Sequence, residues 1–201
     1  MCIIIKKFKM KKINVFLILL TLCLSVSCKE NKKESEQEVI QEEMVTEKTN
    51  DSKELVVKLE PKSDSNVSGN IFFKEQNGTV TMTAVMNGLT EGTHAIHIHE
   101  KSDCSSPDGK SAGGHWNPTG QPHGKWKSPE GFHKGDIGNF EVGADGKGTI
   151  TMSTDEWCIG CGDPNKDIME KGIIVHDAAD DFVTQPTGNA GGRVSCGGII
   201  Q

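Results

Sequence analysis

Seven histidines give this chain its clearest capacity for chemistry, and all of them lie within residues 94–176. Two stand close together, at His97 and His99. Four more follow in Gly/Pro-rich or apolar stretches, and they are His115, His123, His133 and His176. Asp136 comes three residues after His133. Imidazole suits copper and zinc, and a carboxylate that joins histidines suits zinc, so these residues predict a metal site.

An alternation typical of a strand divides the first three histidines between two faces. Residues 93–100 alternate as a half-buried strand does, and successive side chains of a strand point to opposite sides. His97 and His99 are therefore expected on one face. His94 is expected on the opposite, apolar face, where we interpret it as a hydrogen-bonded structural residue. His97 and His99 could merely be solvated, but the further histidines and Asp136 in the same short domain favour an interpretation as metal ligands.

Residues 1–27 are typical of an export signal, because lysines precede a short apolar run at residues 13–24 and small residues follow it. The run is too short for a membrane span. We expect cleavage before Cys28 and lipidation of that cysteine, as in bacterial lipoproteins, with plain secretion as the alternative. Translation could begin at Met1 or at Met10. Lipid at Cys28 would anchor the exported protein at a membrane surface, in the periplasm or elsewhere in the cell envelope.

Residues 28–52 are charged and nearly free of apolar side chains, so we expect a disordered tether, with a long helix as the alternative. The formal net charge of the whole chain is −6. Removing residues 1–27 takes away five lysines and no acid, which brings the charge to −11. This balance argues against a nucleic-acid partner. An anionic substrate would need a local positive focus on such a protein.

The remaining residues, 53–201, have the size of one domain and read as all-β. Residues 80–86 and 148–152 are expected to be strands, since they are rich in Thr, Val, Ile and Met. Asn77–Gly78 and Asp145–Gly146 are expected to be hairpin turns. Short strands with regular turns predict a β-sandwich or barrel.

The cysteines of the predicted domain form an even set, which favours disulfides in an exported protein. They are Cys104, Cys158, Cys161 and Cys196. A bond between Cys104 and Cys196 would tie the loop after the histidine strand to the last strand. The pair Cys158 and Cys161 is open to three interpretations: a local disulfide, a redox pair or a thiolate metal site. We favour the local disulfide, because a thiolate zinc site would need a second pair.

From Lys53 to Gln201 the chain resembles the copper/zinc superoxide dismutases. The matching motifs, in chain order, are residues 92–100 (GTHAIHIHE), 114–118 (GHWNP), 133–139 (HKGDIGN), 175–181 (VHDAADD) and 188–196 (GNAGGRVSC). The resemblance implies a Greek-key, immunoglobulin-like β-sandwich or flattened barrel with long metal-binding loops. The general family pattern lacks the pair Cys158 and Cys161, so this segment departs from the family at a place away from the ligands in sequence. The loop after Asp181 is short, as in the bacterial branch.

The resemblance also implies a full set of metal ligands, for one copper and one zinc per subunit. Copper would be held by His97, His99, His115 and His176. Zinc would be held by His115, His123, His133 and Asp136. His115 would bridge the two metals, and Asp180 matches a carboxylate that links ligands of both. His94 matches a structural histidine of the family, and Cys104 and Cys196 match its disulfide.

Arg193 is the only arginine of the chain. By the resemblance it would guide superoxide to the copper, and Thr187 would narrow the same channel. The implied reaction converts superoxide to molecular oxygen and hydrogen peroxide by alternate reduction and reoxidation of copper. The alternative is an exported copper/zinc buffer or metal-delivery domain without turnover, because a fold does not give a function. A homodimer is possible, and the sequence does not decide it.

Overall fold

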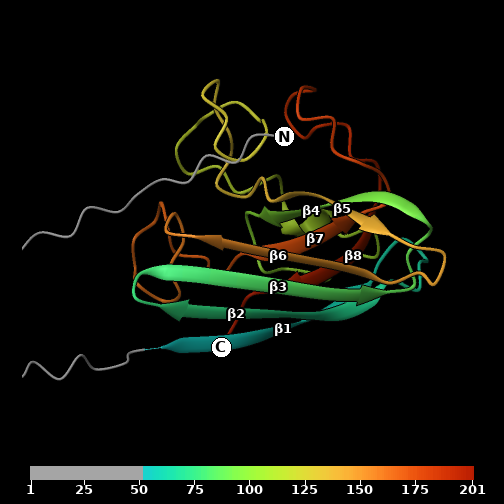
Figure 1. Cartoon of the computed structure of the whole chain (residues 1–201), viewed down its shortest axis with the longest axis horizontal. Helices are drawn as coiled ribbons and strands as arrows, with labels where there is room; N and C mark the ends of the chain where they lie inside the picture. Colours follow the sequence, from blue (N-terminus) through green and yellow to red (C-terminus); the bar gives the residue numbers. More distant parts are fainter. Residues whose placement is uncertain (1–51) are drawn as a thin grey trace, which may run out of the picture. The chain divides into compact units, whose positions relative to one another are not determined.

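The computed structural model describes residues 52–201, and the predicted signal, Cys28 and nearly all of the predicted tether lie outside this range. Eight strands and one short 3-10 turn, η1, make up its regular structure (Figure 1). In chain order they are β1 (Lys53–Pro61), β2 (Ser68–Gln76), β3 (Thr79–Asn87), β4 (Gly92–His99), η1 (Lys110–Ala112), β5 (Gly138–Val142), β6 (Gly148–Thr154), β7 (Gly172–His176) and β8 (Arg193–Gly198). No helix within residues 52–201 is long and apolar enough to cross a membrane.

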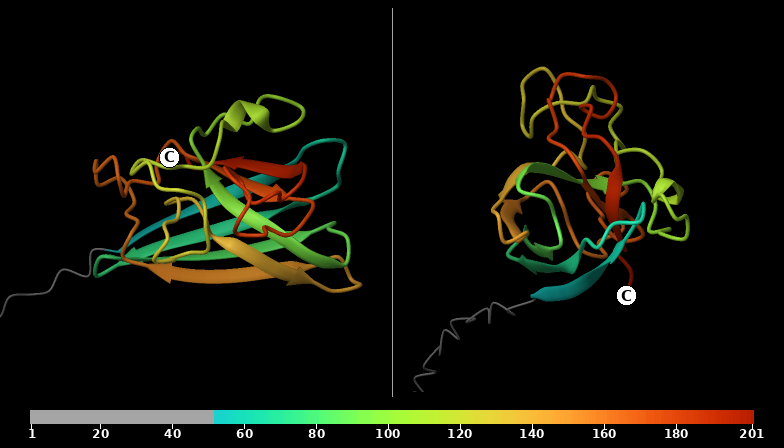
Figure 2. Two further views of the ribbon diagram at one scale, coloured as in Figure 1. Left: turned by 90° about the horizontal axis from the view of Figure 1, so that it is seen from above. Right: turned by 90° about the vertical axis from the view of Figure 1, so that its right-hand side faces the viewer.

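The strands close into an antiparallel barrel in the order β1-β2-β3-β6-β5-β4-β7-β8. The right-hand view of Figure 2 looks toward the end of this barrel. β3 pairs with β6, and β4 pairs with β7, so long connections cross between non-consecutive strands in the Greek-key manner. β1 pairs with β8 at Glu60 and Cys196, which leaves no open edge. The all-β prediction is therefore confirmed.

The two predicted turns lie where the strands reverse. Asn77 and Gly78 join β2 to β3, and both have positive φ, at 53° and 76°. Such angles match the right-handed twist of the flanking strands, and Asn followed by Gly adopts them at little cost. Gly146, between β5 and β6, also has a positive φ of 70°. Local chemistry thus sets the register of both hairpins.

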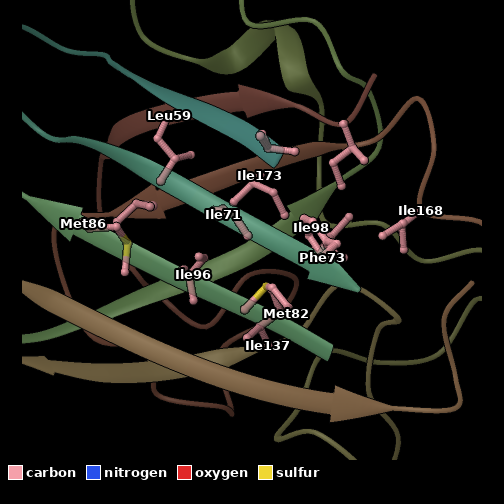
Figure 3. Close-up of a cluster of buried hydrophobic side chains, with 14 of the residues drawn as sticks. Leu59, Ile71, Phe73, Met82, Met86, Ile96, Ile98, Ile137, Ile168 and Ile173 are labelled. Carbon is pink, nitrogen blue, oxygen red and sulfur yellow. The ribbon is translucent and has the colours of Figure 1, made fainter. Parts of the chain in front are cut away.

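The barrel interior is filled by one face of each strand, as the period-two patterns require. On β2, Ile71 and Phe73 are buried, whereas Phe72 between them is 48% exposed. Figure 3 shows these side chains with others of the cluster, which include Leu59, Met82, Met86, Ile96, Ile98, Ile137, Ile168 and Ile173. Aliphatic and aromatic burial of this kind is the main source of stability for a β-barrel.

β4 differs from the half-buried strand that its sequence predicts, because both of its faces are buried. Ile96 and Ile98 point into the core, and His97 and His99 on the other face are also 0% exposed. The connection between β4 and β5 and the connection between β7 and β8 lie over that outer face (yellow and red in Figures 1 and 2). These loops exclude water from the face of β4 that carries His97 and His99. The ring nitrogens of these histidines must therefore find partners within the protein or in a bound ion.

Candidate metal centre

Two strands and the loop between β4 and β5 position the predicted ligands. β4 supplies His97 and His99, and β7 ends at His176, in a strand that pairs directly with β4. The loop after β4 returns along its edge, where His115 pairs with His99 in an isolated bridge. Further along, the Ile98 N–H donates to the Gly135 carbonyl over 2.9 Å. Backbone hydrogen bonds therefore fasten the loop ligands to the same strand that carries the first two.

Two clusters result, and they share one histidine. The first cluster is His97, His99, His115 and His176, and the second cluster is His115, His123, His133 and Asp136. Within each cluster the atoms that can bind a metal lie within 4.8 Å of one another. All seven residues are buried. The structure thus brings together the ligands expected from the sequence, with His115 between the two groups.

The unpartnered nitrogens test whether these clusters fit metal ions. Six buried rings within residues 52–201 have a nitrogen without a hydrogen bond: Nδ1 of His97, His123 and His133, Nε2 of His99 and His115, and both nitrogens of His176. A buried polar atom left unpaired costs about 1–3 kcal/mol, so native proteins rarely keep even a few together. Lone pairs that converge from several rings match a metal ion better than any hydrogen-bonded arrangement.

The second cluster has the dimensions of a tetrahedral site. Three ring nitrogens surround the Asp136 carboxylate, with Nδ1 of His115, His123 and His133 at 2.8, 3.0 and 3.3 Å from its oxygens. Zinc with nitrogen and oxygen ligands at about 2.0–2.1 Å holds neighbouring ligand atoms roughly 3.3 Å apart. The donor set and its spacing therefore fit zinc with little rearrangement.

Burial keeps the first cluster in the form that binds metal. Burial and then the neighbouring histidines lower the pKa of His99 and of His176 well below the usual value. Burial also lowers the pKa of His115 to about 4, although Asp136 acts in the opposite direction. A ligand imidazole must be neutral, because protonation removes the lone pair. These three rings therefore offer their lone pairs at neutral pH.

The second cluster behaves differently because two carboxylates lie beside it. Burial lowers the pKa of His123, but the carboxylates of Asp136 and Asp180 beside its ring outweigh it and raise the pKa to about 9. Burial raises the pKa of Asp136, yet three histidine ring nitrogens close to its oxygens bring it far below the usual range. Without a metal, a proton on His123 thus balances the carboxylates, and a divalent cation would replace it.

Asp180 links the two clusters from outside. Its Oδ2 lies 2.9 Å from Nε2 of His97, and its Oδ1 lies 2.9 Å from Nε2 of His123. Asn139 fixes the backbone of Asp180 in turn, accepting from its N–H and donating to its carbonyl, both over 2.8 Å. Carboxylates that bond the far nitrogen of a ligand histidine fix the ring and its tautomer. One carboxylate therefore orients a ligand of each cluster.

Gly188 lets the Asp180 carboxylate come close to the backbone of the connection between β7 and β8. It has a φ of +67°, and a Cβ there would lie 1.8 Å from Oδ1 of Asp180 and 2.6 Å from Nε2 of His123. Any larger residue would displace the bridge between the clusters. Glycine is thus required at position 188 for two reasons: a Cβ would collide with Asp180, and the positive φ is unfavourable for other residues.

A break in strand register places Arg193 beside the first cluster. β7 and β8 pair regularly up to Val175 and Ser195, after which His176 lies opposite Arg193. Such bulges re-aim side chains near functional sites. Nη1 of the half-buried Arg193 donates to the Gly109 carbonyl over 2.9 Å, so its guanidinium is held in place. Thr187 lies half-buried in the loop that leads to β8.

The structure contains both expected disulfides. Cys104 and Cys196 are joined, and they tie the loop that carries Gly109 to β8. Cys158 and Cys161 form a local bond. Asp167 is near this second pair, but its oxygens accept N–H groups of Gly160, Gly162 and Met169. A metal at Cys158 and Cys161 would therefore lack further ligands.

Several residues that hold the ligands were not found from the sequence. Asn139 reaches Asp180 across 41 positions, and Gln185 reaches His123 across 62 positions. The Gly109 carbonyl that holds Arg193 is a backbone group. Only the loop geometry brings these partners together, and no spacing rule in the sequence marks them.

A sequence profile of the family described as copper/zinc superoxide dismutase (SODC) matches residues 67–199. The chain belongs to this family. The superoxide dismutase-like protein YojM of Bacillus subtilis (strain 168) is 41% identical to it over 117 residues. That match covers 57% of this chain and 59% of the relative, so the chain spans somewhat less than two thirds of that protein.

Solved structures agree with the assignment to this family. A double mutant of a SOD-like protein from Bacillus subtilis superposes with a TM-score of 0.65 at 36% identity, covering 73% of this chain and 97% of that one. The crystal structure of a SOD-like protein from Bacillus subtilis gives a TM-score of 0.63 at 34% identity, covering 72% and 97%. Both are named as dismutase-like, so they support the fold and the family.

The two clusters should bind metal ions separately. We predict that the metal-free protein takes up two divalent ions per chain, and that His123→Ala and His99→Ala each take up one, because each variant leaves the other cluster intact. Elemental analysis after gel filtration measures the content. Two ions retained by both variants would show that the clusters are not the sites.

Proposed function

We propose that the protein is a copper/zinc superoxide dismutase, with copper at the first cluster and zinc at the second. The observation that carries the proposal is the pair of buried clusters that share His115, with unpartnered nitrogens turned toward both. Four imidazoles suit copper, whereas three imidazoles and a carboxylate suit zinc. The reaction consumes two superoxide anions and two protons and yields one molecular oxygen and one hydrogen peroxide.

The first cluster would hold a redox-active ion. Copper supplies the two oxidation states that let one superoxide give up an electron and a second superoxide receive it. His97 and His99 lie on β4, and His176 lies at the end of β7, which pairs with β4. Strand pairing therefore fixes the positions of these three metal-binding rings. Rigid ligands keep the reorganisation small when the charge at the site changes.

His115 is placed to deliver a proton. Its Nε2 faces the first cluster without a partner, and its Nδ1 is held on the side of the second cluster, 2.8 Å from Asp136. The ring can therefore remain anchored through Nδ1 while Nε2 exchanges a proton with the reduced substrate. Zinc in the second cluster would strengthen this anchor and tune the basicity of the ring.

Arg193 supplies the positive focus that an acidic protein needs for an anionic substrate. It lies opposite His176 and is held by the Gly109 carbonyl. A guanidinium stays charged at all physiological pH values and orients a small anion through its N–H groups. We therefore infer that superoxide approaches the first cluster past Arg193, with Thr187 narrowing the same channel.

The first experiment is superoxide removal by the purified protein with bound copper and zinc quantified in the same sample. We expect rapid, cyanide-sensitive turnover at one copper and one zinc per chain. His99→Ala should lose copper and turnover while it keeps zinc, because the second cluster does not use His99. Full loading without turnover would contradict the proposal and favour a metal buffer or delivery domain.

Arg193→Ala should lower the second-order rate constant for superoxide by roughly tenfold or more, since steering by local charge has effects of this size. Metal content should not change, because Arg193 belongs to neither cluster. Lys147→Ala is the matched control: it removes one positive charge from the turn between β5 and β6, where the lysine is exposed. Equal rates for the two variants would exclude a guiding role.

We also infer that the protein is exported and attached by lipid at Cys28. The two disulfides support export, since such bonds persist in oxidising compartments. Cys28→Ser should move the protein from the membrane fraction to the soluble fraction and abolish incorporation of labelled fatty acid. An unchanged membrane fraction would contradict the anchor. The domain itself should keep its turnover, because Cys28 precedes in sequence all the strands that form the barrel.

A further inference from the structure

The side-chain amide of Gln185 lies against the backbone of His123. Its Oε1 accepts the His123 N–H over 2.8 Å, and its Nε2 donates to the His123 carbonyl over 2.8 Å. Both backbone groups of a predicted zinc ligand are thus satisfied by one side chain that lies 62 positions away. The amide acts on His123 as a neighbouring strand would act on a residue in a sheet.

His123 needs such support because its own segment is irregular. It lies between Pro122 and Gly124, in a stretch without strand or helix. Proline has no N–H to donate, and glycine has the widest backbone freedom. The ring of His123 is fixed at Nε2 by Asp180. That contact orients the imidazole but leaves the backbone of His123 to be fixed by Gln185.

The loop that carries Gln185 is itself well ordered by hydrogen bonds. Oδ1 of Asp181 accepts the N–H groups of Val183 and Thr184, at 2.9 and 2.8 Å. The Asp181 N–H donates to the Gly188 carbonyl over 2.8 Å, which closes the base of the loop. Gln185 is therefore presented from a pre-formed turn, so little entropy is lost when it contacts His123.

We propose that Gln185 is a positioning residue for the second cluster: it holds the backbone of His123 so that Nδ1 faces the zinc ion. The inference rests on the proposed function, because it takes zinc as the occupant of that cluster. Partners of metal ligands commonly change metal affinity by 10- to 100-fold when they are removed. Gln185 acts through His123: within residues 52–201 its side chain bonds the backbone of His123 and the Val183 carbonyl, and no other member of the cluster.

The test compares zinc release from loaded wild-type protein, Gln185→Ala and Gln185→Glu, using a chromophoric chelator in excess. Gln185→Ala should release zinc about tenfold faster. Gln185→Glu should fall between the two, since it keeps an oxygen for the His123 N–H but loses the donor to the carbonyl. Cobalt in the second cluster gives a second readout, because its visible bands report ligand geometry and should shift in Gln185→Ala.

Gln121→Ala is the matched control. Gln121 is also an exposed glutamine of the region around His123, and its side chain makes one long contact, 3.5 Å to the Thr119 carbonyl. It should keep the wild-type rate of zinc release and the wild-type cobalt spectrum. Thermal unfolding of the metal-free variants checks that the barrel is intact, which the exposed position of Gln185 favours.

Equal zinc release and identical cobalt spectra for Gln185→Ala and wild type would overturn the inference while leaving the proposed function intact. A wild-type protein that binds no zinc at the second cluster would overturn both. If the wild type binds zinc but does not remove superoxide, only the dismutase proposal fails, and the comparison of zinc release still decides the role of Gln185.

Discussion

The burial of six imidazoles whose unpaired nitrogens face one another is the constraint on which the rest of the structure depends. Each such atom has lost its contact with water, and at about 1–3 kcal/mol apiece the group would destabilise any fold that left it unsatisfied. Metal ions satisfy several lone pairs at once. The long loops, the bridging carboxylate of Asp180 and the sole arginine are all arranged around that requirement.

Side-chain groups from distant parts of the chain hold the ligands in place. Asp180 connects His97 to His123, Asn139 fixes the backbone of Asp180, and Gln185 fixes the backbone of His123. The amides of Asn139 and Gln185 bond backbone groups of residues in irregular loops, where no neighbouring strand supplies those hydrogen bonds. The loops are thus as well determined as the barrel beneath them, which is what pre-organised metal ligands require.

The sequence predicts the fold and the metal-binding residues, but not the residues that hold those ligands in place. Alternation along β4 separates His94 from His97 and His99, and Asn-Gly marks the first hairpin, because both signals are local. The same alternation predicts a half-buried strand, whereas both faces of β4 are buried, since two long loops cover the face of His97 and His99. The contacts of Asn139 and Gln185 and the bulge before Arg193 depend on loop paths, which no short pattern encodes.

β4 serves two purposes at once, since Ile96 and Ile98 enter the core while His97 and His99 face outward. The core packing of Ile96 and Ile98 therefore holds the same strand that presents His97 and His99. The imidazoles of His97 and His99 lie two residues apart on this strand, and the two long loops cover them. A change in the core packing of β4 would therefore be felt directly at the metal-binding histidines, because one short stretch of backbone carries both.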